Sequence, residues 1–433
     1  MNRIILTFTE EDAAAATDSG LFSEVFLWDT AKSTTTILSS IGPYLLELGV
    51  VNPRNIDLVR IALGVLAADR SVLRQARGSN WNTRNFELTI PVESPSAWKP
   101  YAQDLSQIVD FLSGDYWKFR FTQAPPASET ILGLEEQRHS RAVLLSGGAD
   151  SASGALISAH QLSPGQSQEL VSHFSQNAIS PVQRAIVTTL NETIPRITSV
   201  HRQFRLHRAA TRLDGTDFPN EFSSRSRSLL FLALGLAVAS QSSVPLWIPE
   251  NGFASLNPPL GPDRRGSLST RTTHPFFLRR LATLMENVGG HGEIINPLES
   301  MTKGEMFRQV AKAVGDDAAS IYLSATNSCS HTDARFIGAS STSSCGVCFG
   351  CLVRRAAFIS SGIPDRTQYL LHDKSGKSDD FIEQKTIVEP LRDFVARGIR
   401  SRDIVAMPLP GEYSPREALS ICERGVEELG SLF

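Results

Sequence analysis

A short apolar run that breaks into two glycines constrains this chain more than any other feature. In "RAVLLSGGADSASGALISA", residues 141–159, the apolar run Ala142–Leu145 predicts a strand buried on both faces of a sheet. The Ser-Gly-Gly of residues 146–148 then leads directly into a helix of small residues. Glycines at such a turn let backbone N–H groups converge, and the positive end of the following helix attracts anions. The stretch therefore predicts a phosphate-binding loop.

Strands and helices alternate after this loop. Another helix begins after Thr302, where Glu305 completes a capping box, and it ends at Gly315. Such alternation predicts an α/β fold with a doubly wound parallel sheet, whose ligand site lies at the carboxyl ends of the strands. The other predicted strands are Glu169–Phe174, Ile197–Phe204 and Val244–Ile248, and the other predicted helices are Ser151–Leu162, Pro181–Glu192 and the buried Arg227–Ser240.

Four of the five cysteines lie close together in the sequence. Cys329, Cys345, Cys348 and Cys351 have the spacing C-x15-C-x2-C-x2-C. Four thiolates close a tetrahedral shell around zinc and leave no open position, which predicts a structural ion whose charge Arg354 and Arg355 would offset. An iron–sulfur cluster and four reduced core thiols stay open as alternatives.

The composition limits the classes of partner. The 433 residues suffice for two or three domains, and the formal net charge is −3. No basic domain or stripe predicts nucleic-acid binding, although a small tRNA contact stays open. The longest apolar run, Leu229–Ala239, has 11 residues and is too short to span a bilayer. We expect a soluble, cytoplasmic protein without a membrane partner.

The loop resembles a known signature. Ser-Gly-Gly-x-Asp-Ser, residues 146–151, is similar to the signature of the PP-loop ATP pyrophosphatases, whereas the lysine of a Walker A loop is missing. The cysteine cluster and the segments "HFSQNAISPVQRAI", "SRSRSLLFLALGLAVA" and "PLESMTKGEM" narrow the resemblance to the 7-cyano-7-deazaguanine synthases (QueC) over about Arg141–Gly362. The longer layout, with additions at both ends, resembles the synthase-like C component of the Qat anti-phage systems.

The resemblance implies a domain layout, a reaction and three cofactors. The reaction is adenylation of the carboxylate of a 7-deazaguanine with ATP, Mg²⁺ and a structural Zn²⁺, and the acceptor is ammonia or an amine of a partner protein held by the N-terminal domain. A PP-loop tRNA-modifying enzyme and a non-catalytic nucleotide-binding scaffold of a defence complex are the alternatives. The predicted segments are an N-terminal α+β accessory domain (1–130), the PP-loop ATP-binding domain (131–325), a four-cysteine zinc segment (326–365) and a helical C-terminal extension (366–433).

The resemblance also assigns roles to single residues. Pyrophosphate and Mg²⁺ would be held by Ser146, Gly147, Gly148, Asp150 and Ser151, with Arg227 and Lys303 as cations for the phosphates. Arg225, Arg264, Arg265 and Arg271 are further cations, for which a solvated surface role is an equal alternative.

Two more predictions come from position in the sequence. Glu250 and Asn251 follow a strand and would read the edge of the base, unless they merely cap the turn before Gly252. His274 is either an acid/base group or a turn residue.

Overall fold

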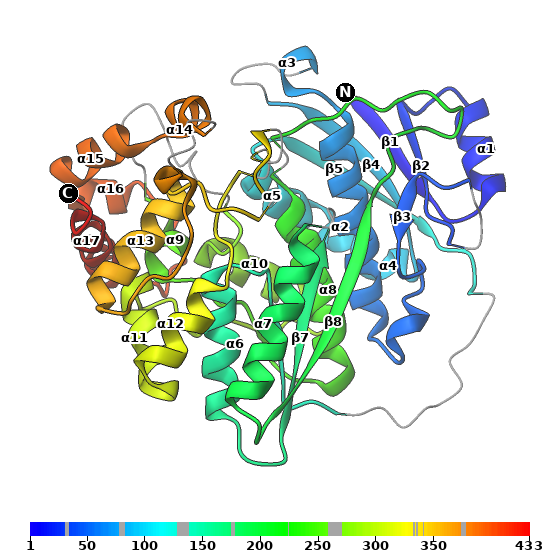
Figure 1. Ribbon diagram of the computed structural model, residues 1–433. Coiled ribbons are helices and arrows are strands. Elements are labelled where there is room, and N and C mark those ends of the chain that lie inside the picture. Colours follow the sequence, from blue (N-terminus) through cyan, green and yellow to red (C-terminus); the bar gives the residue numbers. More distant parts are fainter. Residues whose placement is uncertain are drawn as a thin grey trace.

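The computed structural model describes residues 1–30, 34–77, 83–127, 138–174, 178–223, 225–258, 271–331, 334, 337–340, 342–373 and 378–433. Two mainly parallel sheets lie one beside the other, with helices between them and on their outer faces (Figure 1). Within the described part of the chain, no helix combines the length and the apolar character needed to cross a membrane.

The larger sheet has six strands. All described neighbours in it run parallel except the edge pair β3 and β8, which is antiparallel. Chain order reverses between β6 and β9, so the crevice outside their carboxyl ends is the topological switch point of a doubly wound sheet. This confirms the predicted α/β architecture. In spatial order the strands are β10 (Ile294–Ile295), β9 (Leu246–Trp247), β6 (Arg141–Leu144), β7 (Ser167–Phe174), β8 (Thr198–Arg208) and β3 (Ile37–Ser39).

Both faces of the larger sheet are covered, as the apolar strand predicted. Val143 and Leu145 face the helices α6 and α11, whereas Ala142 and Leu144 belong to the core around α8 (Arg227–Ser242). The predicted capping box of Thr302 and Glu305 is present at the start of α11, and Gly315 ends that helix. The helices on the first face are α6 (Ala149–Gln161), α7 (Ile179–Thr193), α11 (Lys303–Val314), α12 (Asp316–Ser324) and α13 (Phe349–Ser361).

The smaller sheet corrects the prediction for the N-terminal segment. Its four strands are all parallel, and helices alternate with them, so the segment is α/β and not α+β. The helix between the first two strands buries only Ala13 and Ala16, which gave no helical pattern in the sequence. In spatial order the strands are β2 (Glu24–Leu27), β1 (Asn2–Thr7), β4 (Asn85–Val92) and β5 (Tyr116–Gln123); the helices are α1 (Glu10–Asp18), α2 (Pro53–Ser71), α3 (Arg74–Arg77), α4 (Pro95–Trp98) and α5 (Ala102–Ser113).

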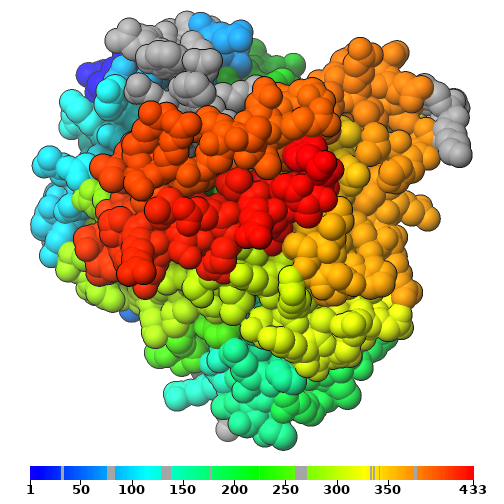
Figure 2. Space-filling view, turned by 90° about the vertical axis from the view of Figure 1, so that its left-hand side faces the viewer, coloured from blue at the N-terminus to red at the C-terminus, as the bar shows by residue number. Residues whose placement is uncertain are grey.

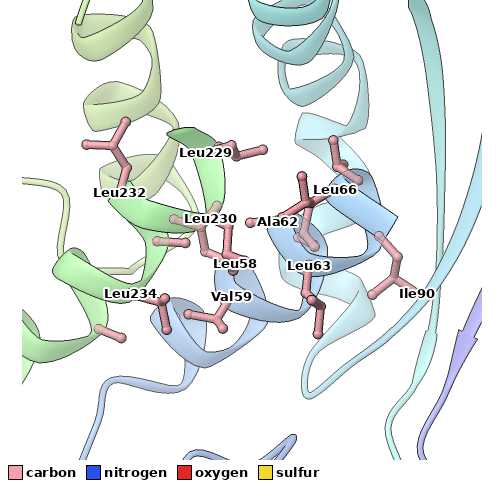
Figure 3. Close-up of a cluster of buried hydrophobic side chains, with 14 of the residues drawn as sticks. Leu58, Val59, Ala62, Leu63, Leu66, Ile90, Leu229, Leu230, Leu232 and Leu234 are labelled. Carbon is pink, nitrogen blue, oxygen red and sulfur yellow. The ribbon is translucent and has the colours of Figure 1, made fainter. Parts of the chain in front are cut away.

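One hydrophobic core joins the two sheets. Helix α2 packs against α8 (Arg227–Ser242), the predicted buried helix, and Leu58 and Ala62 lie against Leu229 and Leu230 while Ile90 of β4 closes the other side (Figure 3). Strand β3, also from the N-terminal segment, extends the larger sheet. The N-terminal segment therefore shares a core with β6, the strand that leads into the predicted phosphate-binding loop.

The C-terminal segment is helical, as predicted, and covers one face of the molecule. Its last helix, α17, lies against α9 and α13, and the orange and red residues form a continuous layer in the space-filling view (Figure 2). The remaining helices are α9 (Gly252–Leu256), α10 (Pro275–Asn287), α14 (Asp379–Lys385), α15 (Val388–Arg397), α16 (Ser401–Val405) and α17 (Pro415–Gly430).

Candidate active site

The loop after β6 has the backbone form that its glycines predicted. Gly147 has φ +94°, in the left-handed region, and a Cβ there would lie 3.1 Å from Cδ1 of Ile179. A side chain at this position would therefore be strained and crowded. Gly148 is the N-cap of α6, so the loop runs directly into the positive end of that helix.

Hydroxyl groups and backbone amides surround the loop. The N–H of Gly148 donates to Ser146 Oγ (3.3 Å), and the N–H of Ala149 donates to Ser328 Oγ (3.3 Å). Ser151 Oγ lies 2.9 Å from Ser146 Oγ and donates to the Gly148 carbonyl. The first turn of a helix leaves N–H groups without an intrahelical acceptor, and Ser146 is exposed. These groups fit a phosphate, whose oxygens accept from amides and hydroxyls.

A buried cluster of polar side chains stands beside the loop at the switch point. Lys303, the first residue of α11, donates its Nζ to Oδ2 of Asp150. Asn251 donates its side-chain Nδ2 to Oδ1 of Asp150 (2.8 Å) and to Oε1 of Glu250 (3.2 Å). The carboxyl ends of β6 and β9 and the start of α11 thus meet at one carboxylate.

The two carboxyl groups of this cluster have opposite pKa shifts. Burial alone would raise the pKa of Asp150, but the Lys303 ammonium and the Asn251 donors outweigh it and hold that pKa below its usual range. Burial and the neighbouring Asp150 raise the pKa of Glu250 well above 4.5. Pairs of titratable groups whose pKa values are pushed apart are typical of acid/base sites.

Three predicted site residues have partners that change their expected roles. Lys303 is only 6% exposed and is paired with Asp150, so it does not reach out of the cluster toward a phosphate. Asp150 accepts from both Lys303 and Asn251, so each of its two oxygens already has a hydrogen-bond partner. Asn251 caps α9 by accepting the N–H of Ala254 (3.0 Å), which is the turn-capping alternative.

The predicted cations lie at different places. Arg227 is exposed and begins α8, whereas Arg225 donates its Nη1 to the Ser113 carbonyl (3.4 Å). Arg271 donates to the Phe111 carbonyl (2.9 Å) and lies over the Phe111 ring. Arg264 and Arg265 lie outside the described residues.

His274 is a structural residue. Its side chain is the N-cap of α10, where Nδ1 accepts the N–H of Phe276 (3.2 Å). Burial and the nearby Arg271 lower the pKa of His274 to about 4, so the ring is neutral near pH 7. The turn-residue interpretation is therefore correct, and the acid/base alternative has no geometric support.

The four clustered cysteines converge as predicted. Their sulfur atoms all lie within 4.8 Å of one another, and the pairs Cys329–Cys348 and Cys345–Cys351 are 3.9 and 3.8 Å apart. A disulfide would need about 2.05 Å. Tetrahedral zinc with Zn–S bonds of about 2.3 Å sets sulfurs about 3.8 Å apart, so the thiol set fits this metal.

Two arginines that follow the cysteines in the sequence donate hydrogen bonds to different parts of the chain. Arg354 is fully buried and donates to the carbonyls of Leu323 and Ser324 at the end of α12, so it does not serve the metal centre directly as predicted. Arg355 donates to the Gly346 carbonyl (3.0 Å) and supports the turn between two of the cysteines.

Sequence reasoning missed three residues that support the loop. Gln183 donates to the Ser146 carbonyl (3.2 Å), and the N–H of Asn327 donates to the Gly147 carbonyl (2.9 Å). Ser328 completes the set through the N–H of Ala149. The proximity of residues 327 and 328 to Cys329 was the available signal, because a metal ligand fixes its neighbours. The segment that leads into Cys329 is therefore in direct contact with the predicted phosphate-binding loop.

Comparisons with curated proteins find several similar sequences that share one name. No family model matches the chain. A curated protein from Cupriavidus necator named 7-cyano-7-deazaguanine synthase is 28% identical over 242 residues, covering 52% of this chain and 96% of that protein. Proteins of the same name from Novosphingobium aromaticivorans (33% identical; 36% of this chain, 59% of that protein) and Myxococcus xanthus (30% identical; 33% and 55%) are also similar. These similarities support a relationship to that group of synthases, and the Qat likeness stays a prediction.

Proposed function

We propose that this protein is an ATP-dependent synthase of the 7-cyano-7-deazaguanine synthase type, which adenylates the carboxylate of 7-carboxy-7-deazaguanine. The observation that carries the proposal is the loop of residues 146–151 at the switch point between β6 and β9. Similarity to the named synthases over about half the chain supports the same reaction class. The position of the loop and the names of the similar proteins thus both support ATP-dependent activation of a carboxylate.

The proposed reaction divides into two transfers. A carboxylate oxygen attacks the α-phosphorus of ATP, a new P–O bond forms, and pyrophosphate leaves. An amine then attacks the acyl carbon and AMP leaves, with ammonia or an amine of a partner protein as the acceptor. In 7-cyano-7-deazaguanine synthesis, a second ATP drives the dehydration of the amide to the nitrile.

The residues of this chain would mainly bind and orient. The amides of the first turn of α6, with Ser146 and Ser151, would hold the pyrophosphate group as charge develops on it. Asp150 would fix the start of α6 through Lys303 and Asn251. Glu250, with its raised pKa, is the remaining group that could hold a proton or read the base. Arg227 would face the substrates from the start of α8.

Zinc would hold the segment that carries Asn327 and Ser328 against the loop. Mg²⁺ is expected to enter with ATP, because Asp150 is already paired. A role in anti-phage defence, with a protein amine as acceptor, is a further prediction from the resemblance.

The deciding experiment uses the zinc-loaded full chain with Mg-ATP, 7-carboxy-7-deazaguanine and ammonium, followed by mass spectrometry. We expect AMP, pyrophosphate and either the nitrile or an activated carboxylate. Activation without nitrile would direct the search to a mass shift on a partner protein. Intact ATP with wild-type protein would contradict the proposal and favour the scaffold alternative, and AMP formation that depends on tRNA would favour the tRNA-modifying alternative.

A further inference from the structure

Helix α17 contacts both segments that hold Asp150. It lies beyond Gly362, where the sequence resemblance ends. On one side it packs against α9, because a Cβ on Gly425 would lie 2.4 Å from the Phe253 ring and a Cβ on Gly252 would lie 2.8 Å from Ile421. Such approaches leave no room between the two helices.

On its other side α17 holds the first turn of α11. Glu428 accepts the N–H of Gly304 with Oε2 (2.9 Å), one residue after Lys303. Arg424 pairs with the carboxylate of Glu305 and donates to the Ser300 carbonyl (2.9 Å). A carboxylate at the N-terminus of a helix is favourable for the helix dipole. Burial raises the pKa of Glu428, while its contacts with the helix start and Lys303 oppose that rise.

The two contact points of α17 coincide with the two partners of Asp150. Lys303 is the first residue of α11, and Asn251 is the N-cap of α9. A shift of either helix start by the length of one bond would lengthen a hydrogen bond to Asp150, and hydrogen bonds weaken steeply with such changes.

We propose that α17 is a positioning element of the site and that Glu428 is its key positioning residue. Glu428 keeps the start of α11 in place, so that Lys303 stays bonded to Asp150. Ile421 and Gly425 keep α9 in place, so that Asn251 also stays bonded to Asp150. The positioning of α9 and α11 by α17 does not depend on the proposed function, whereas the effect of α17 on ATP turnover rests on it.

Amide hydrogen exchange tests the structural part on the zinc-loaded full chain. In Glu428→Ala, exchange of the segment 302–306 should rise about tenfold or more, because a charge-assisted hydrogen bond to its backbone is lost. Glu428→Gln should restore most of the protection, since its amide oxygen can accept the same N–H. Glu427→Ala is the matched control, because Glu427 is exposed on the same helix. Equal exchange in Glu428→Ala and Glu427→Ala would overturn the proposal.

ATP turnover tests the functional part with a double-mutant cycle. Glu428→Ala should lower kcat about tenfold with a smaller change in KM, and it should lower kcat no further in an Asp150→Asn background. Equal losses in both backgrounds would contradict action through Asp150. A wild-type protein that leaves ATP intact would refute the proposed function, and the exchange measurement would still decide the positioning role.

Discussion

The two sheets of the molecule share one construction and differ in the helices that come after their central strands. In the smaller sheet α1 comes after β1, and its first turn carries Glu10, Glu11 and Asp12. In the larger sheet α6 comes after β6, and its first turn carries only Asp150, which Lys303 neutralises. Three carboxylates at a helix start repel phosphate, whereas a neutralised one leaves the helix end free to attract it.

A buried carboxylate lies near the carboxyl ends of the strands in each sheet, and the two carboxylates differ in what surrounds them. Asp57 accepts from Arg60 (3.0 Å), from the N–H of Glu93 (2.7 Å) and from the indole of Trp98 (3.0 Å), and Arg60 lies over the Phe8 ring. These large side chains fill the edge of the smaller sheet. At the larger sheet small residues leave Ser146 exposed beside the Asp150 cluster. A parallel sheet therefore provides a place for a site, and the residues after its strands decide whether one exists.

The largest expected effect concerns the four-cysteine cluster, whose neighbouring residues Asn327 and Ser328 contact the loop after β6. Cys351→Ser should remove about one zinc per chain and lower the unfolding free energy by several kcal/mol, since structural zinc contributes on the order of 10 kcal/mol. Metal analysis and hydrogen exchange check this, with increased exchange around Ala149 and little change in β1 and β4. Iron and sulfide in place of zinc would identify a cluster instead.

A matched pair of substitutions tests the comparison directly. Lys303→Met removes the cation paired with Asp150, and Arg60→Met removes the nearer of the two cations beside Asp57, with Arg54 still 3.6 Å away. The first should cost about 3–5 kcal/mol of stability and the second less, because Arg54 remains. Only Lys303→Met should also lower ATP turnover, by about 100-fold, because it alone disturbs an electrostatically organised site. Urea unfolding and turnover assays measure the two effects. Equal loss of turnover in both variants would show that the carboxylates of the two sheets do not differ in their effect on turnover.

A smaller effect is expected at His274, on the helix that packs against α5. Its folded-state pKa of about 4 lies below the ordinary 6.5, so the unfolded state binds the proton first and stability is lost as pH falls from 6.5 to 4. His274→Asn keeps a capping oxygen and should remove this loss. Urea midpoints at pH 7 and pH 5 check the slope. A changed pH profile of turnover would restore the acid/base alternative.

The smallest effect has the opposite sign and belongs to the smaller sheet. Burial raises the pKa of Asp110 to about 6, so the folded state holds a proton that the unfolded state releases, and stability falls as pH rises from about 4 to 6. Asp110→Asn should flatten this slope while still accepting the N–H of Trp117. The same urea series measures it, and an unchanged slope would show that another group titrates.

Local patterns predicted the parts of the molecule that are determined locally. The Ser-Gly-Gly turn, the strand before it and the capping box of Thr302 each depend on a few neighbouring residues, and all were predicted correctly. The convergence of the cysteines was also predictable, because three of the four lie within seven positions of one another.

Contacts between distant segments could not be predicted in this way. Asp150 and Lys303 are 153 positions apart, and the sequence gives each a charge without a partner. Glu428 carries no local mark of its contact with Gly304, 124 positions away. The parallel order of β1, β2, β4 and β5 depends on long-range pairing, and a helix as weakly patterned as α1 gave no sign of it.

The antiparallel pairing of β3 with β8 makes the N-terminal segment inseparable from the larger sheet. A fragment that begins within residues 128–137 would lack β3. It would expose the edge of β8 along residues 206–208, with backbone groups free to pair with another chain. It would also expose the leucines of α8 that α2 covers. Such a fragment should self-associate, so the N-terminal segment should be expressed and engineered together with the half that carries the loop of residues 146–151.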